Sequence, residues 1–328
     1  MLTVGIFNDT SVTGHYGCTA VMDTLIRELA VRDVKPAYLW PVAEDWHGHL
    51  ARLEKFRPDM IIVNGEGTIH HSLERKRTRD LLDIAPYARD RGLPAHLINA
   101  SIADLDPLAL DALRGFTSIH VRESESLDYL AANGISARLA PDLSLGLSPP
   151  NAPPTRSGVM VTDSVLKESA QSLRLFAAEA GARHERMKPR TTVREFFYKR
   201  GRRLLRRGPL IRHWRPRSDP RAFAQRLSAS ELIVTGRFHS VLLAILTDTP
   251  FLAVASNTRK IEAVLTDVFG NTERLVTPAA LEDPEFTRSL HNISPFSDAE
   301  RVALARYRTS ATAAHQKMFD TLVETHPR

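Results

Sequence analysis

The fold class is decided by the stretch LIVTGRFHSVLLAIL, residues 232–246. Residues 232–235 form a short apolar run typical of a buried strand, and Gly236 ends it. Residues 239–246 follow as an apolar helix, so the stretch predicts one strand–helix unit of a parallel sheet. Ligands bind beyond the carboxyl ends of such strands, which puts Arg237 and His239 where a binding site is expected.

The same alternation of strands and helices runs along the rest of the chain. In the first half, strands are predicted at 3–7, 37–40, 60–63, 96–99, 118–121 and 135–139, and helices at 17–32, 46–56, 74–91, 107–113 and 123–133. In the second half, strands are predicted at 158–162, 232–235 and 251–255, and helices at 165–180, 221–227, 239–246, 261–268 and 299–323. We therefore predict an α/β protein with two Rossmann-like, doubly wound domains.

A proline-dense stretch at residues 148–155, SPPNAPPT, separates the two halves and predicts a stiff linker. The expected units are an acceptor-side domain at 1–148, the linker at 149–156, a donor-side domain at 157–298 and a C-terminal helix at 299–328. Two such domains facing a cleft form the architecture called GT-B in glycosyltransferases. By analogy with that architecture, we expect the last helix to pack back onto the first domain.

Composition excludes several classes of protein. The net charge of +6 arises from residues 183–221, which hold 15 Lys and Arg against 3 Asp and Glu, whereas the remainder holds 29 basic and 35 acidic residues. A uniformly basic nucleic-acid binder is thus the weaker explanation, and no nucleic-acid partner is expected. The chain has one cysteine and no run near the roughly 18 apolar residues of a membrane span. These features, with a strand-like rather than signal-like N-terminus, predict a cytoplasmic protein.

The basic segment, residues 183–221, carries apolar residues at helical spacing opposite its arginines. This pattern predicts an amphipathic helix at 193–214 that contacts an anionic membrane surface, so the protein would be peripheral at the inner face of the membrane. Binding of an acidic polysaccharide or lipid-linked acceptor, a protein interface and a solvated insertion remain alternatives. The side chains expected to contact the membrane or acceptor are Phe196, Phe197, Arg202, Arg203 and Trp214.

Four segments resemble the polysaccharide pyruvyltransferase family. They are VTGRFHS at 234–240 with DTP at 248–250 and Lys260, IHVRESES at 119–126 with Leu130 and GI at 134–135, APD at 140–142, and NGEG at 64–67. The family has an Arg-x-His at its strand–helix junction, and many members have three consecutive glycines in the fourth segment. Here Glu66 replaces one of those glycines. The loop at 8–18 carries GHYG instead of the commoner Asn-x-Gly-Asp, so the acceptor side departs from the family pattern.

The resemblance implies a transferase that moves a pyruvyl group from phosphoenolpyruvate, without a cofactor, onto a sugar of a cell-surface polysaccharide or lipid-linked glycan. Ketal formation requires a proton on the methylene carbon of the donor, and a histidine is a suitable general acid. His239 is the candidate acid, with a cap or a core histidine as the alternative. Glu66, held between two glycines, is the candidate base for the acceptor hydroxyl.

Further side chains that follow the predicted strands are candidates to bind the substrates, and most of these are suited to anions. Arg237 offers a forked cation at a helix N-terminus, although Arg122 could instead pair with Glu123 or Glu125. Asp142 could simply cap a turn, and the first loop could simply turn the chain. The complete set of expected substrate contacts is Arg237, Arg122, Lys260, Asn8, His15, Tyr16, His70, Asp142 and Ser240.

Two other functions remain open. One is a GT-B glycosyltransferase that uses a nucleotide sugar, and the other is a non-catalytic, membrane-associated partner in polysaccharide assembly. The dinucleotide and P-loop fingerprints are absent from the sequence. His70 and His71 are adjacent and face different directions on a helix, and no other His/Cys/Asp group has metal-ligand spacing, so no required metal is predicted.

Overall fold

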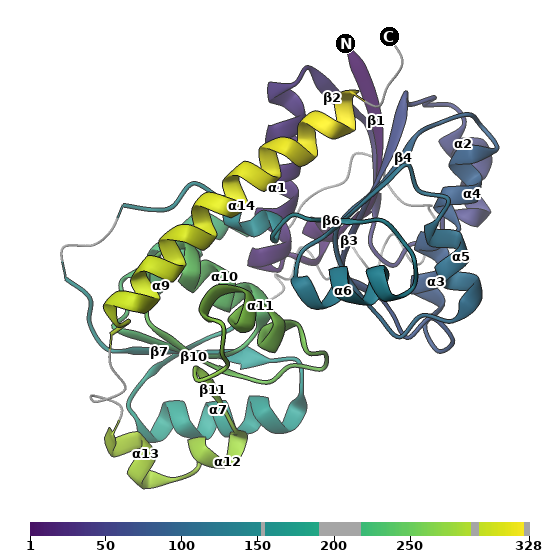
Figure 1. The fold of residues 1–328 in the computed structure, drawn as a ribbon. Helices are drawn as coiled ribbons and strands as arrows, with labels where there is room; N and C mark the ends of the chain where they lie inside the picture. The colour runs from purple at the N-terminus through teal and green to yellow at the C-terminus, as the bar shows by residue number, and fades with distance from the viewer. Residues whose placement is uncertain (152–154, 190–217, 290–294, 325–328) are drawn as a thin grey trace, which may run out of the picture.

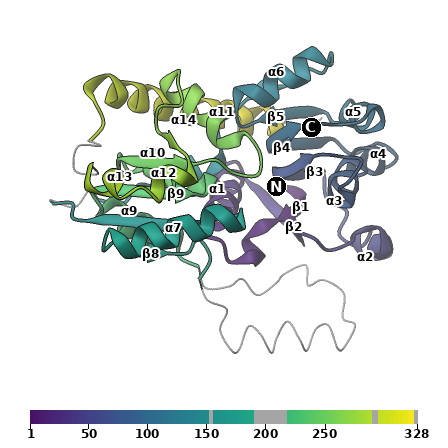
Figure 2. The ribbon, with the colours of Figure 1, turned by 90° about the horizontal axis from the view of Figure 1, so that it is seen from below.

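Two parallel sheets form the framework of the protein. The computed structural model describes residues 1–151, 155–189, 218–289 and 295–324. The first sheet has the order β2-β1-β3-β4-β5-β6 and the second has the order β11-β10-β9-β7-β8. Figure 2 shows the domains built on these sheets lying side by side. The predicted amphipathic helix at 193–214, with all five of its predicted contact residues, lies outside the described residues.

The first domain alternates strands and helices. Its strands are β1 (Leu2–Asp9), β2 (Val34–Pro41), β3 (Met60–His70), β4 (Ala95–Ala103), β5 (Ser118–Val121) and β6 (Arg138–Leu139). Its α-helices are α1 (Tyr16–Val31), α2 (Leu50–Leu53), α3 (Lys76–Leu82), α4 (Ile84–Arg89), α5 (Pro107–Leu113) and α6 (Ser124–Ala132). Short 3-10 turns occur at η1 (Thr10–Thr13), η2 (His47–His49) and η3 (Leu143–Gly146).

The second domain repeats the pattern. Its strands are β7 (Val159–Ser164), β8 (Arg183–Glu185), β9 (Leu232–Gly236), β10 (Phe251–Val254) and β11 (Leu275–Val276). Its helices are α7 (Lys167–Glu179), α9 (Pro220–Ser228), α10 (Phe238–Leu246), α11 (Lys260–Phe269), α12 (Pro278–Leu281) and α13 (Pro284–Ser289), and α14 (Asp298–Glu324) follows. The prediction of two doubly wound α/β domains is therefore confirmed.

Helices cover both faces of each sheet. Successive residues of a strand point to opposite faces, so each strand packs its side chains against helices on both sides. In β1, Val4 and Ile6 pack with α1 and α14 on one face, whereas Phe7 packs on the other face with residues of α3, α4 and α5. The second sheet is covered by α9, α10 and α11 on one face and by α7 and α12 on the other. Strands buried on both faces explain the continuous apolar runs in the sequence.

Helix α14 ties the two domains together, as expected from the GT-B analogy. Leu304 and Tyr307 join the core of the second domain, whereas Met318 and Phe319 pack against α1 and the first sheet. Figure 1 shows this long yellow helix running from the second domain up along α1. In the part of the chain described by the structure, no helix is long and apolar enough to cross a membrane.

Several predicted elements are wrong in extent, including the strand predicted at 135–139, of which only β6 at Arg138–Leu139 is present. The helix predicted at 74–91 is two helices, because Pro86 lacks an N–H and is tolerated only in the first turn of a new helix, α4. The helix predicted at 46–56 is reduced to η2 and the single turn α2. Strand β3 extends to His70 through the glycine-rich stretch that was expected to leave the sheet.

Candidate active site

In each sheet, the chain first adds a strand on one side of its first strand and then continues on the other side, so the strand order reverses there. β1 lies between β2 and β3, and β7 lies between β8 and β9, so a crevice opens beyond the carboxyl ends of each pair. Asn8 and Glu66 lie at the first crevice, and Asp163 and Arg237 lie at the second. The residues at the two crevices meet across the domain interface, and this places the site between the two domains.

His239 stands at the centre of this interface. It begins the first turn of α10 and is 8% exposed, and its ring centroid lies 5.5 Å from that of His15 in the first domain. Its Nε2 lies 3.7 Å from Asp142 Oδ2. Burial alone would raise the pKa of Asp142, but the charges of His239 and Arg122 outweigh it and hold that pKa well below its usual range.

The close approach of His239 to α1 depends on a missing side chain. A Cβ atom on Gly17 would lie 2.1 Å from Cγ of His239, far inside van der Waals contact. Gly17 therefore lets the imidazole rest on the first turn of α1, next to His15. No feature of the isolated motif GHYG pointed to this role, because the partner lies in the other domain.

Glu66 occupies a strained position on β3. Its φ of 41° lies in the left-handed region, which glycine adopts easily and other residues adopt at a cost. A glycine would adopt this conformation without strain. The carboxylate accepts hydrogen bonds from Thr10 Oγ1, from Asn64 Nδ2 at 3.2 Å and from Cys18 Sγ at 3.3 Å. Burial, followed by the charge of Glu66, raises the pKa of Cys18 well above its usual range.

Arg122 is buried and held on several sides. Its Nη1 donates to Asp142 at 2.8 Å and its Nε donates to Ser101 at 2.8 Å, while the guanidinium carbon lies 4.3 Å from the Phe238 ring centroid. Glu123 lies 3.7 Å away. The predicted salt bridge with Glu123 exists, but the closer partner is Asp142, from the start of η3. Asp142 is fully buried, so its place is behind Arg122 and His239 rather than at an open ligand site.

Two cations converge on Gly67. Arg122 Nη2 and Lys260 Nζ lie 3.4 and 3.6 Å from the position that a Gly67 side chain would take. Lys260 has no carboxylate within ion-pair distance among the described residues, and its nearest polar partner is Asn257 Oδ1 at 3.4 Å. Burial, followed by repulsion from Arg122, lowers the pKa of Lys260 to about 8. The ammonium of Lys260, which no carboxylate pairs with among the described residues, favours a bound anion here, and Nη2 of the paired Arg122 faces the same point.

The space beside these cations is a pocket of about 370 Å³ between the domains. This volume is within the ordinary range for small-molecule sites. Its walls come from β3, β4 and α6 of the first domain and from the start of α11 in the second. They include Gly67, His70, Ser101, Glu123, Tyr129 and Lys260.

Arg237 does not present a free guanidinium. Its Nε and Nη2 donate to the two carboxylate oxygens of Asp163 at 3.1 and 2.7 Å. This bidentate pair occupies the donors with which the guanidinium would bind a ligand. Asp163 also accepts from the backbone of Met187. Asp163 was not among the predicted site residues, although it directly follows a predicted strand, where a functional residue was to be expected.

Three other predicted contacts face inward. Ser240 is fully buried in the first turn of α10 near Thr162. Tyr16 stacks on Phe223 across the interface, with ring centroids 4.6 Å apart, so it joins the domains. Asn8 is 3% exposed and donates from Nδ2 to the backbone oxygen of Asn64 at 2.6 Å. Asn8 and Ser240 therefore shape the site from within the core, whereas Tyr16 stays partly exposed beside Phe223.

The histidines of the first domain divide into two places. His70 lines the pocket, bonded to His71 and Arg75, and burial lowers its pKa to about 4. His15 lies against His239 instead, and burial, followed by the charge of His239, lowers its pKa well below its usual range.

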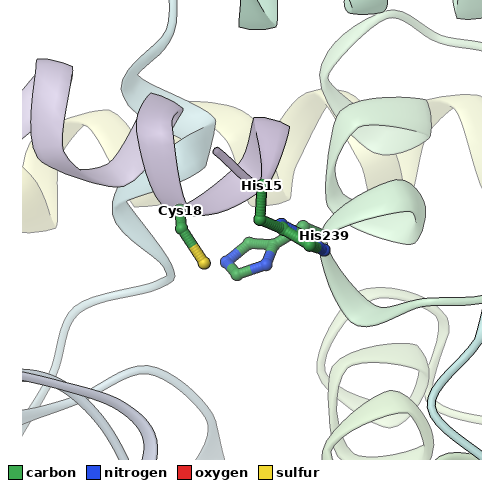
Figure 3. Close-up of side chains that lie close together, drawn as sticks. All are labelled: His15, Cys18 and His239. Atoms are coloured by element: carbon green, nitrogen blue, oxygen red, sulfur yellow. The ribbon is translucent and has the colours of Figure 1, made fainter. Parts of the chain in front are cut away.

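The structure brings together one group of potential metal ligands that spacing along the sequence does not show. His15, Cys18 and His239 bring one potential ligand atom each within 4.8 Å of one another. Figure 3 shows the three side chains pointing toward a common space. Spacing along the chain could not reveal this group, because His239 is more than 200 residues away from the other two.

Comparison with known proteins identifies the family of this chain. The family model described as polysaccharide pyruvyl transferase matches residues 15–258. This chain belongs to that family. The match begins at His15 and includes Glu66, Arg122, Asp142 and His239, so most of the interdomain site falls within the family region. A search of curated protein sequences gives no match.

Several solved structures of other proteins are similar in fold to this pyruvyltransferase-family chain. Arabidopsis thaliana UGT89C1, complexed with UDP-L-rhamnose, has a TM-score of 0.56 at 12% identity and covers 99% of both chains. The UDP-GlcNAc 2-epimerase of Methanocaldococcus jannaschii has a TM-score of 0.54 at 12% identity over 95% of this chain and 100% of its own. The S. aureus MnaA–UDP structure has a TM-score of 0.52 at 13% identity, covering 100% and 99%. The fold is therefore GT-B-like.

Proposed function

We propose that this family member transfers a pyruvyl group from phosphoenolpyruvate onto two hydroxyls of one sugar in a polysaccharide or lipid-linked glycan. The observation that carries the proposal is the convergence of Arg122 and Lys260 on Gly67, at a pocket between the domains. Phosphoenolpyruvate carries a phosphate and a carboxylate, and both suit a site with two cations. The family match supports the transferase chemistry.

The reaction requires one proton at the donor carbon. His239 would donate it to the methylene carbon of phosphoenolpyruvate, whose double-bond electrons form the new C–H bond and leave an oxocarbenium centre. A first sugar hydroxyl adds to this centre and loses its proton to a base, for which Glu66 is the candidate. Inorganic phosphate then leaves, and a second hydroxyl of the same sugar closes the ketal. The phosphate leaves as its bond to the ketal carbon breaks, and it takes up the proton of the second hydroxyl. The proton held by Glu66 returns through solvent to His239, so atoms and charge balance.

The direct test is phosphate release. Purified protein, phosphoenolpyruvate and a panel of bacterial glycan fragments should give inorganic phosphate and a product heavier by the pyruvylidene group, detected by mass spectrometry. If no acceptor gives turnover, while a UDP-sugar but not phosphoenolpyruvate raises the melting temperature, the proposal fails and a glycosyltransferase is favoured. Attachment to an anionic membrane through residues 193–214 is a separate hypothesis, and co-sedimentation with anionic vesicles would test it.

The state of Lys260 makes a specific prediction for donor binding. Its pKa of about 8 means that the ammonium loses its proton as the pH rises through about 8. The KM for phosphoenolpyruvate should therefore be low at pH 7 and rise steeply between pH 8 and 9. Lys260→Arg should flatten that rise, because a guanidinium stays charged at these pH values. If KM in Lys260→Arg rose with pH as steeply as in the wild type, Lys260 would not bind the donor.

A further inference from the structure

A group of metal-ligating side chains lies between the domains and is used only in part by the proposed chemistry. His15 and Cys18 belong to the start of α1, and His239 belongs to the start of α10. Their potential ligand atoms lie within 4.8 Å of one another (Figure 3). The two domains thus contribute jointly to one small cluster, with a thiol and two imidazoles.

Two nitrogen atoms of this cluster lack the partners that buried polar atoms normally have. Nδ1 of His15 is buried and has no hydrogen-bond partner among the described residues, and the buried Nε2 of His239 has Asp142 Oδ2 only at 3.7 Å, beyond hydrogen-bond distance. Buried polar atoms without partners are uncommon in folded proteins and suggest an absent ligand. His239 is only 8% exposed, so solvent can hardly replace the missing hydrogen bond of its Nε2.

We propose that His15, Cys18 and His239 form a binding site for a zinc-class divalent ion that links the two domains. Imidazole nitrogen and thiolate sulfur are the preferred protein ligands of Zn²⁺, and three protein ligands with one open position are common. Bonds of about 2.0–2.3 Å around a tetrahedral ion place ligand atoms closer together than in the present cluster. Small rotations of the three side chains would close that difference.

Charges of both signs surround the cluster: Arg237, Lys188 and Lys260 act on His15, whereas a carboxylate lies beside each of the other two ligands. Glu66 Oε2 lies 3.3 Å from Cys18 Sγ, and Asp142 Oδ2 lies 3.7 Å from His239 Nε2. A divalent ion would displace the Cys18 proton to solvent and gain a thiolate ligand. The two carboxylates would then balance the charge of the ion from the surrounding shell.

An ion bound here would also affect catalysis, a consequence that rests on the proposed function. Coordination takes up the electron pair that His239 needs to carry its proton. Zn²⁺ should therefore inhibit pyruvyl transfer reversibly, and a chelator should restore it. Binding of the ion does not depend on this consequence and can be measured without any substrate.

The test uses Zn²⁺ titration of the full chain and the absorption spectrum of its Co²⁺ complex. The wild type should bind one ion per chain, and Co²⁺ should show a near-ultraviolet thiolate charge-transfer band. Cys18→Ala should abolish the band, and Cys18→Ala and His15→Asn should each weaken Zn²⁺ binding by about 10-fold or more. His47→Asn is the matched control, because His47 belongs to an exposed cluster with Asp80 and Asp83.

The outcomes separate the alternatives. Loss of binding in Cys18→Ala and His15→Asn, with His47→Asn unchanged, supports the proposed site. Loss only in His47→Asn, or absence of the charge-transfer band in the wild type, overturns it. Circular dichroism of each variant would show whether weakened binding reflects unfolding. If one of the two ligand variants is unfolded, the other still tests the site. Phosphate release without zinc, together with no zinc binding, would reject the metal site and leave the proposed function intact.

Discussion

Replacing His239 by glutamine is expected to lower kcat for pyruvyl transfer by about 10²–10⁴-fold, the usual contribution of a general acid. Glutamine fills a similar space and keeps a polar end but cannot donate a proton of suitable acidity. Donor binding should survive, because Arg122 and Lys260 are intact in this variant. The KM for phosphoenolpyruvate should therefore stay close to that of the wild type while kcat falls, as steady-state phosphate release would show.

Asp142→Asn provides a companion to this experiment. Asp142 is fully buried behind His239 and touches no open space, so it acts as a positioning residue. Its amide variant should reduce kcat less than His239→Gln, and it should also raise the KM for phosphoenolpyruvate, because Asp142 holds Arg122 in the donor site. His47→Gln, which alters an exposed histidine outside the site, should retain full activity. If His239→Gln kept wild-type kcat in a folded protein, His239 would not be the acid.

The framework of the fold could be predicted from sequence because it rests on local patterns. Short apolar runs such as 60–63 and 232–235 predicted strands wherever both faces of the sheet are buried, and helical periodicity predicted α1 and α10. The sequence patterns gave wrong strand ends where the local preference of the residues differs from the structure that tertiary contacts impose. β3 continues through Gly65 and Gly67 because the pairing with β4 holds the backbone there, although glycine usually weakens a strand.

The site was predictable only in part for the same reason. Strand ends marked Arg122, Arg237 and His239 as candidates, but not their partners, since each partner lies on another element. Asp163 neutralises Arg237, whereas Lys260 lacks such a carboxylate among the described residues. Sequence reasoning assigned both the same anion-binding role, and only the folded arrangement distinguishes them.

Arg122→Met should produce the largest loss of stability. The side chain of Arg122 is 2% exposed, and it pairs at 2.8 Å with Asp142, which is fully buried. Methionine would leave the carboxylates of Asp142 and Glu123 buried without their cation. Removing one member of a buried ion pair typically costs about 3–5 kcal/mol, because the remaining charge is uncompensated. Urea denaturation at pH 7 should show this decrease in the free energy of unfolding.

A double-mutant cycle separates the stranded charge from simple loss of packing. In Arg122→Met/Asp142→Asn, the buried negative charge of Asp142 is removed as well, so part of the lost stability should return. Arg89→Met is the matched control: its pair with Asp90 is exposed, and such pairs contribute about 0–1 kcal/mol. Equal losses in Arg122→Met and in the double variant would mean that packing on Phe238, rather than charge, makes Arg122 necessary. In that case the proposed anion site would still have its lysine, but Asp142 would no longer explain why Arg122 is held with Nη2 facing Gly67.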